Sequence, residues 1–364
     1  MNYLYGFLIF FLLPLLGSGQ LRLVTPLQDV IFESSGLITL QGKLITHNDS
    51  GGYPALYELD SITGAVTRSV FIINATNRDW EDICHDGTYI YIADFGNNTG
   101  SRTDLRIYRI AVADYFSTPD NTVSADTINF SYADQTDFTP GSFSTNFDAE
   151  ALITGNDSLY IFTKNWGNGW TSIYALPKLP GTYQTTRIDS INTQGLVTGA
   201  VYDSTNNRIT LSGYTYTDPF LVEISDFSFS EFSSGTIDRL VIPPPQGFSI
   251  QVEGITTFQS GYYLTAEVNT TGEAALYRLD RSLLSSDDNT LSHCSVYPNP
   301  ATSFIRVHCA DFSTAELYDM QGVLQKTSDQ KQIDISGFRK GTYLLIVKNK
   351  IGKEILSEKV IFDY

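Results

Sequence analysis

Three glutamates hold the same place in a repeated strand pattern and are the residues best suited to chemistry. Glu81, Glu150 and Glu253 each open a short apolar strand. Carboxylates that converge either raise one another's pKa or gather a cation, and Ca²⁺ prefers carboxylate and amide oxygens. Similar oxygens follow the second strands of three units. We therefore predict a calcium site drawn from six residues: Glu81, Glu150, Glu253, Asn48, Asp94 and Glu267.

The loops that carry some of these oxygens also have a purely structural explanation. Residues 48–52 (Asn-Asp-Ser-Gly-Gly) and 94–98 (Asp-Phe-Gly-Asn-Asn) have the composition of tight turns. No turn requires Glu where a strand opens, so the glutamates lack that explanation. We interpret His47 and His85 as polar turn or lining residues, with a general base as the alternative. The sequence contains no nucleophile elbow and no phosphate loop.

These residues belong to a three-strand unit that recurs five times. In one unit, apolar alternation between turns predicts strands at 81–83, 88–93 and 105–110. From the opening residue of each unit to a landmark in its third strand, the separation is 22 to 27 residues. Such spacing predicts an all-β fold, a β-propeller of five blades by count. One ring around the central channel should be lined by the opening residues Ser35, Glu81, Glu150, Thr198 and Glu253.

The ends of the repeated region predict how the ring closes. Residues 21–25 form an orphan strand, and the fifth unit lacks a fourth, outer strand. Pairing the two would remove the exposed edges of an open array. The other outer strands are expected at 65–72, 127–133, 186–191 and 237–242. Six blades stay open because residues 111–145 and 225–248 are long enough for another strand set, and a β-sandwich is the competing fold.

Charge divides the chain into two regions. The net charge of -17 excludes a nucleic-acid backbone as partner, because phosphate binding needs a basic face. Residues 296–364 hold 9 Lys+Arg and 8 Asp+Glu, whereas the preceding residues hold 14 and 32. The balance therefore changes from -18 to +1 near residue 296, which indicates a domain boundary. We predict a propeller domain over 20–290, a linker over 291–295 and a C-terminal domain over 296–364.

The first 19 residues are predicted to be a signal peptide. They are apolar and uncharged, and small residues at Gly17 and Gly19 suit a cleavage site before Gln20. The apolar stretch is short for a membrane span of about 20 residues. A retained anchor is the alternative, because the stretch has no Lys or Arg before it. No other segment could span a bilayer, so the mature chain is predicted to have no transmembrane segment.

The three cysteines are too few for a disulfide framework. Cys294 and Cys309 flank the start of the last domain and could pair in an oxidising compartment. Cys84 lies on an apolar strand and is interpreted as a small buried side chain.

An aromatic loop offers a second kind of site. Residues 165–170 read Asn-Trp-Gly-Asn-Gly-Trp. Exposed rings can stack on the apolar faces of sugars, although packing in the core explains the same composition.

The C-terminal region carries the most specific motifs. It contains Val-Tyr-Pro-Asn-Pro-Ala at 296–301, Leu-Tyr-Asp-Met-Gln-Gly at 317–322 and Lys-Gly-Thr-Tyr-Leu-Leu-Ile-Val at 340–347. This region resembles the type A C-terminal sorting domain of cargo of the Bacteroidetes type IX secretion system. Alternating strands between glycine turns predict a small β-sandwich. The motif residues are Pro298, Asn299, Pro300, Gly322, Gly341 and Tyr343.

The resemblance implies an export route. The family's tail is recognised by the type IX translocon and removed by a sortase-like peptidase. Delivery then runs through the periplasm to the outer cell surface or the medium. A carbohydrate-binding or adhesive sandwich is the alternative interpretation of this domain.

The central region is similar in arrangement to secreted calcium-containing propellers of the lactonase and phytase-like kind. This resemblance is architectural and carries no catalytic motif. We expect a binding or scaffold module for a glycan or protein ligand. The alternative is a calcium-dependent hydrolase acting on an ester, lactone, phosphate or glycan at the acidic axis, so the sequence leaves catalysis open.

Overall fold

The computed structural model describes residues 21–215, 218–242, 250–259, 261–267, 273–281, 295–297, 299–309, 312–319, 323–350, 352 and 354–362. The predicted signal peptide lies outside these residues. The chain divides into two compact units, Met1–Leu284 and Ser285–Tyr364. No helix in the described part of the chain is long and apolar enough to cross a membrane.

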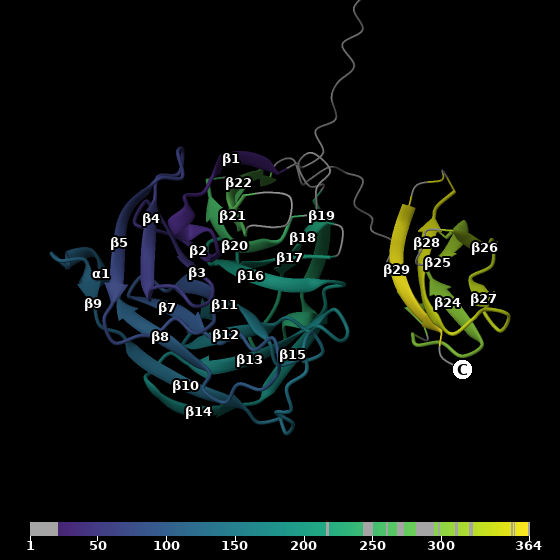
Figure 1. Ribbon diagram of the computed structural model, residues 1–364, viewed down its shortest axis with the longest axis horizontal. Coiled ribbons are helices and arrows are strands. Elements are labelled where there is room, and N and C mark those ends of the chain that lie inside the picture. The colour runs from purple at the N-terminus through teal and green to yellow at the C-terminus, as the bar shows by residue number, and fades with distance from the viewer. Residues whose placement is uncertain are drawn as a thin grey trace, which may run out of the picture. The chain divides into compact units, whose positions relative to one another are not determined.

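The first unit is a β-propeller of five sheets (Figure 1). The first sheet contains β2 Ser34–Leu40, β3 Lys43–Asn48, β4 Ala55–Leu59, β5 Val66–Ile72 and β9 Thr122–Val123. The second contains β6 Trp80–His85, β7 Tyr89–Asp94, β8 Arg106–Ala111, β10 Asp126–Tyr132 and β14 Gly181–Thr185. The third contains β11 Ala149–Gly155, β12 Ser158–Thr163, β13 Trp170–Pro177 and β15 Arg187–Asn192.

The remaining two sheets complete the ring. The fourth contains β16 Leu196–Asp203, β17 Arg208–Tyr214, β18 Pro219–Ser225 and β19 Thr236–Val241. The fifth contains β20 Val252–Phe258, β21 Gly261–Ala266, β22 Ala275–Asp280 and β1 Arg22–Pro26. The inner strands β2, β6, β11, β16 and β20 contact one another in this order, and β20 returns to β2. In the described part of this unit, three short helices lie in connections: η1 Asp29–Ile31, α1 Val112–Ser117 and η2 Phe232–Ser234.

The N-terminal strand closes the ring as predicted. β1 pairs antiparallel with β22, with Leu23 opposite Tyr277 and Pro26 opposite Ala275. Leu21, immediately before β1, is 2% exposed and packs in the core of the last sheet. The outer edge of the fifth sheet is therefore covered by the chain's own beginning, which avoids an open strand edge.

The two long connections do not hold a sixth blade. Residues 111–145 contain α1, β9 and β10, and the described part of 225–248 contains η2 and β19. Two short strands were not predicted from the sequence. Each pairs in parallel with the outer strand of the blade before its own: β9 pairs with β5, and β14 pairs with β10. Each comes from a later part of the chain, so these strands connect neighbouring blades.

Apolar side chains fill the spaces between neighbouring sheets. One cluster joins the first two sheets through Ile45, Trp80 and Tyr108, and Trp80 is fully buried. Equivalent clusters lie between each of the other neighbouring pairs. Because the strands near the axis are covered on both faces, their sequences are mostly continuous apolar runs.

The second unit is a small β-sandwich with one shared core. One sheet contains β23 Ser295–Tyr297, β24 Phe304–His308 and β27 Gln332–Asp334. The other contains β25 Thr314–Asp319, β26 Leu324–Ser328, β28 Gly341–Lys348 and β29 Glu354–Phe362. Cys309 is disulfide-bonded, and Cys84 is a buried free thiol in the first unit. Cys294, the predicted partner of Cys309, lies outside the described residues.

Candidate metal centre

Each inner strand is irregular at the residue predicted to open its unit. In β6, Trp80 pairs with Asp94 and Asp82 pairs with Ala93, so Glu81 is left between them. The same break occurs at Glu150 in β11 and at Thr198 in β16. In β2 and β20 the break spans two residues, 35–36 and 253–254. A β-bulge bends the strand and redirects a side chain, so the five opening positions share a special backbone geometry.

Side chains at the axis connect the inner strands to one another. Ser35 Oγ donates to the carbonyl of Glu81 at 2.6 Å. The fully buried Asp82 carboxylate accepts the backbone N–H groups of Leu152 at 2.7 Å and Ala200 at 3.3 Å. Burial raises the pKa of Asp82 well above its ordinary value, although these donors oppose the shift. Asp82 thus joins three blades. This structural role was not predicted from the sequence, because Asp82 stands at the start of an apolar strand.

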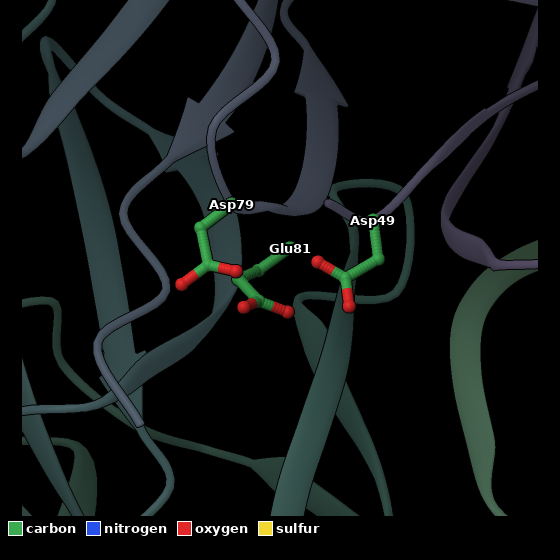
Figure 2. Close-up of side chains that lie close together, drawn as sticks. All are labelled: Asp49, Asp79 and Glu81. Atoms are coloured by element: carbon green, nitrogen blue, oxygen red, sulfur yellow. The ribbon is translucent and has the colours of Figure 1, made fainter. Parts of the chain in front are cut away.

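Three carboxylates converge beside the axis (Figure 2). One ligand oxygen each from Asp49, Asp79 and Glu81 lie within 4.8 Å of one another. Asp49 follows β3 of the first blade, Asp79 precedes β6 of the second, and Glu81 lies within the β6 bulge. Glu81 is only 4% exposed. Folding therefore places three acids from two blades in one small, partly dehydrated space.

More acids surround this triad. Buried Glu150 lies 3.1 Å from the ammonium of buried Lys164. The pKa of Glu253 is raised well above its ordinary value by burial and by Glu267 and Glu150, although Lys164 lowers it. Burial also raises the pKa of Glu267, again against the effect of Lys164. The predicted glutamates therefore belong to one electrostatic centre.

The pKa values of the triad and its neighbours show how costly their negative charges are. Burial raises the pKa of Asp79 to about 6, with Arg102 lowering it and Asp148 raising it. Burial, followed by repulsion from Glu150, raises the pKa of Asp148 to about 7. Burial, followed by repulsion from Asp79, raises that of Asp49 to about 9. The pKa of Glu81 is also well above its ordinary value, because of burial and then Glu150. At neutral pH, part of this centre holds protons unless a cation replaces them.

Buried oxygens without donors adjoin the triad in sequence. Asn48 Oδ1, Asp49 Oδ1 and Asn77 Oδ1 are buried and have no hydrogen-bond donor within the described chain. The two asparagines use their amide groups elsewhere: Asn48 Nδ2 donates to the Val30 carbonyl, and Asn77 Nδ2 donates to the Asn48 carbonyl. A buried acceptor without a donor costs free energy. Carboxylate and amide oxygens of this kind suit a hard cation.

Asp94 is not one of the three converging carboxylates, although its charge adds to the burial that raises the pKa of Asp79. Its Oδ1 accepts from Arg102 at 2.9 Å, and its Oδ2 lies 3.7 Å from Arg106 Nε. Arg102 is itself 7% exposed and also lies 3.9 Å from Asp79. Asp94 thus pairs with Arg102 of the β7–β8 connection and with Arg106 of β8, just as Glu150 pairs with Lys164.

Asp79 is not among the ligands predicted from the sequence, and Asp49 is among the predicted features only as a residue of the 48–52 loop. A signal for Asp79 was present, because an acid stands two residues before the glutamate in both Asp79-Trp80-Glu81 and Asp148-Ala149-Glu150. No local signal distinguishes Asp49 from an ordinary turn residue, since the blade-to-blade approach brings it to Glu81.

Gly96 packs directly against the triad. A Cβ atom at this position would collide with Glu81 Oε1 and lie 2.6 Å from Asp79 Oδ2. The Gly96 N–H also donates to the Asp79 carbonyl at 3.2 Å. The absence of a side chain therefore lets the β7–β8 connection cover the carboxylates.

The motif residues of the second unit have structural partners. Asn299 Nδ2 donates to the Lys359 carbonyl at 2.8 Å, and Asn299 Oδ1 accepts from the Ile361 N–H at 2.9 Å. The ring of Tyr343 stacks on Phe362, with centroids 4.5 Å apart. Pro300 follows Asn299, and Gly341 begins β28 with a φ of +149°, which side chains rarely adopt. Pro298 and Gly322 lie outside the described residues.

Several solved structures are similar to the chain. A glycosyl hydrolase from Bacteroides ovatus has a TM-score of 0.44 and 11% identity, and the match covers 73% of this chain and 94% of that one. The GH43_1 enzyme from Xanthomonas citri has a TM-score of 0.43 and 13% identity, covering 72% and 90%. PorZ, a surface component of the type IX secretion system of Porphyromonas gingivalis, has a TM-score of 0.34 and 12% identity, covering 91% and 45%.

Sequence comparison identifies the last domain. β-Agarase D of Zobellia galactanivorans is 32% identical over 70 residues, which are 19% of this chain and only 15% of the agarase. Residues 295–363 match the family described as the secretion system C-terminal sorting domain. The protein is therefore a type IX secretion cargo, a β-propeller with a C-terminal sorting domain that directs it to the cell surface or the medium.

Proposed function

We propose that this exported propeller is a binding module whose ligand-binding face is organised by Ca²⁺ held between two blades. The observation that carries the proposal is the convergence of Asp49, Asp79 and Glu81 within 4.8 Å (Figure 2). Oxygens bound to one Ca²⁺ at about 2.3–2.6 Å are at most about 5 Å apart. The three carboxylates therefore fit one such ion.

The surroundings support a cation. Repulsion and burial raise the pKa values of all three ligands, and a divalent ion would relieve both effects. The partnerless oxygens of Asn48 and Asn77 belong to the same segments as Asp49 and Asp79. Glu150, Glu253 and Glu267 form the outer acidic shell in this proposal, with Glu150 already balanced by Lys164. Asp94 has no ligand role in it, because arginines hold it.

The test is a calcium titration of the full chain after chelator treatment. Isothermal titration calorimetry should detect calcium uptake at pH 7.5, and calcium at a hundred times its Kd should stabilise folding by about 2.7 kcal/mol. The Asp49→Asn and Glu81→Gln double variant should lose both effects. Asp114→Asn, a change of an exposed side chain on α1, is the matched control. Equal calcium binding by the double variant and the wild type would refute this centre.

A calcium-dependent hydrolase is the second candidate. The observation that favours it is Lys164, whose buried ammonium lies beside the acids and 4.9 Å from the centre of the Trp166 ring. Burial opposes its charge, but Glu150 and Glu253 raise its pKa overall. A permanently charged ammonium there could stabilise negative charge that develops on an ester, lactone, phosphate or glycan.

A substrate screen separates the two functions. The wild type and the Asp49→Asn, Glu81→Gln double variant would be assayed on ester, lactone, phosphate and glycan substrates, with calcium and with chelator. Calcium-dependent turnover that the double variant lacks would establish the hydrolase. Calcium binding without turnover on any substrate would leave the binding module.

We also propose a function for each segment of the chain. Residues 1–19 act as the signal peptide, residues 20–290 bind the ligand, residues 291–295 connect, and residues 296–364 engage the translocon. A sortase-like peptidase removes the last domain after transit. Mass spectrometry of protein from the culture medium or cell surface tests this, because the exported form should lack both the first 19 residues and the sorting domain.

A further inference from the structure

An aromatic ring is exposed on the connection between β10 and β11. Phe143 is 63% exposed and has a φ of +54°, a conformation that bulky side chains rarely adopt. Hydrogen bonds to the β7–β8 connection hold this segment: the Gly141 N–H donates to the Thr99 carbonyl at 2.9 Å, and Gln135 Nε2 donates to the Gly100 carbonyl at 2.7 Å. The fold therefore maintains an unfavourable backbone while leaving an apolar ring in water, a combination that points to function.

The ring of Phe143 packs against the ring of Trp166. The two rings have centroids 4.7 Å apart and an interplanar angle of 64°. Trp166 Nε1 donates to Asp148 Oδ2 at 2.7 Å, and the Trp166 N–H donates to the Thr145 carbonyl at 3.2 Å. In the aromatic loop 165–170, Trp166 is thus a support for Phe143, and Trp170 at the end of the loop is 38% exposed against 63% for Phe143.

The side chains around this ring are neutral and polar. Ser142, Ser144 and Asn146 are exposed beside Phe143, and Asn168 is exposed beside Trp166. Asn146 Oδ1 lies 3.5 Å from where a Cβ of Gly167 would stand, so the two connections meet there. An apolar ring bordered by amides and hydroxyls matches a ligand that has both C–H faces and hydroxyl groups.

We propose that Phe143, supported by Trp166, binds a sugar ring of a neutral glycan. The C–H face of the sugar stacks on Phe143, and its hydroxyl groups bond to Asn146 and Asn168. This inference rests on the binding function proposed above and names its ligand class. A polyanionic glycan is disfavoured, because the protein has a net charge of -17 and no basic side chain lies in 142–146.

The sugar site and the acidic centre share a residue. Asp148 accepts from Trp166 through Oδ2 and from the Asn97 N–H through Oδ1, at 2.7 and 2.6 Å. It stands two residues before Glu150, on the same blade opening. Asp148 therefore links the support of the proposed sugar site to the acidic centre.

Affinity electrophoresis of the full chain tests the proposal, in gels containing soluble β-glucan, xylan, galactan or mannan and in a gel containing the polyanion polygalacturonate. At least one neutral polysaccharide should retard the wild type. Phe143→Ala should weaken that retardation about tenfold, which corresponds to ~1.4 kcal/mol, and Phe143→Trp should retain it. Phe71→Ala is the matched control, because Phe71 is a 41% exposed ring on β5 of another blade.

Three results would overturn the inference. The first is that no neutral polysaccharide retards the wild type. The second is that the wild type and Phe143→Ala are retarded equally. The third is that only polygalacturonate retards the protein. Circular dichroism melting should show that Phe143→Ala is folded. Calcium titration of the same samples separates the two proposals: glycan binding without calcium uptake refutes only the calcium centre, and calcium uptake without glycan binding refutes only the sugar site.

Discussion

Lys164 Nζ lies 3.1 Å from Glu150 Oε1, and both side chains are buried. Glu150 adds to the burial that raises the pKa of Glu81 in the triad. Lys164 opposes the burial that raises the pKa values of Glu253 and Glu267. It places one positive charge within a group of carboxylates that would otherwise repel one another. The stability of the axis therefore depends on this ammonium.

Removing that ammonium should be strongly destabilising. Lys164→Met leaves Glu150 buried without its partner, and loss of one member of a buried pair costs about 3–5 kcal/mol. Lys43→Met is the matched control, because Lys43 is 51% exposed and the carboxylate beside it, Glu58, keeps its ion pair with Arg68 at 3.0 Å. Urea denaturation measures both, and adding Glu150→Gln to Lys164→Met should recover part of the loss. Equal effects of the two lysine variants would contradict the role of Lys164.

The chelated protein should lose stability as the pH rises from 7 to 9. The pKa of Asp148 is raised to about 7 and that of Asp49 to about 9, from ordinary values of 3.8. Asp148 completes the loss of its proton at the start of this range, whereas Asp49 in the folded state still holds a proton that the unfolded state has already released. Deprotonation therefore favours unfolding, by about 1.4 kcal/mol per pH unit for the Asp49 proton. His47, whose pKa is lowered to about 4 from 6.5, is neutral in both states within this range.

Thermal melts in chelator at several pH values measure this effect. Saturating calcium should flatten the dependence, because the ion favours the ionised carboxylates. A melting temperature that stays constant between pH 7 and pH 9 in chelator would show that these acids are already ionised in the folded protein.

Gly96→Ala should weaken calcium binding without removing a ligand. The added Cβ would collide with Glu81 Oε1 and crowd Asp79 Oδ2, so the two carboxylates must move. Gly52→Ala is the control, because a Cβ there would meet Asn48 and Asn77 only at ordinary contact distances of 3.8 and 3.9 Å. Calorimetric titration should show a weaker Kd for Gly96→Ala alone. Identical affinities for the two variants would count against this arrangement.

A chain that begins at Leu27 should melt at a lower temperature and aggregate. It lacks β1, so β22 becomes an exposed edge, and exposed strand edges pair with other chains. It also lacks Leu21, which packs among the apolar residues of the fifth sheet. A chain that begins at Leu21 is the control. Calorimetry and light scattering compare the two, and indistinguishable melting would mean that ring closure contributes little.

Deleting residues 295–364 should leave the protein in the periplasm. These residues include the whole matched sorting domain. Asn299→Ala should reduce export more mildly, because it removes both side-chain hydrogen bonds between the start of this domain and β29. Cell fractionation with an antibody to the propeller measures each, and Asn349→Ala, in the turn before β29, is the control. Undiminished surface delivery of the truncated chain would refute the role of this domain.

The number of blades could be predicted because strands are local. Alternation over a few residues indicates each strand, and the recurrence of Ser35, Glu81, Glu150, Thr198 and Glu253 at similar positions indicates equivalent strands. The outer strands were predictable from the same alternation. The closing strand was predictable because the fifth unit lacked an outer strand and residues 21–25 formed a strand without a partner, so pairing the two removes an exposed edge. The parallel strands β9 and β14 were not, because two to five residues carry little pattern and their partners lie in another blade.

The candidate centre was predictable only in part. The sequence identified Glu81, Glu150 and Glu253, because repetition marks residues at equal depth around an axis. The choice of Asp49 and Asp79 depends on how closely two blades approach, and the pairing of Asp94 depends on the path of the loop that carries Arg102. Phe143 likewise lies outside the predicted aromatic loop and meets Trp166 only through folding.

The sequence by itself determined the strand order, the opening residues of the blades and the sorting motifs, because these depend on neighbours within a few residues or on exact recurrence. Only the tertiary structure decided which carboxylates share a space, which are neutralised and which ring stays in water. Those outcomes depend on distances between segments far apart in the chain, and the packing of one blade against the next sets those distances.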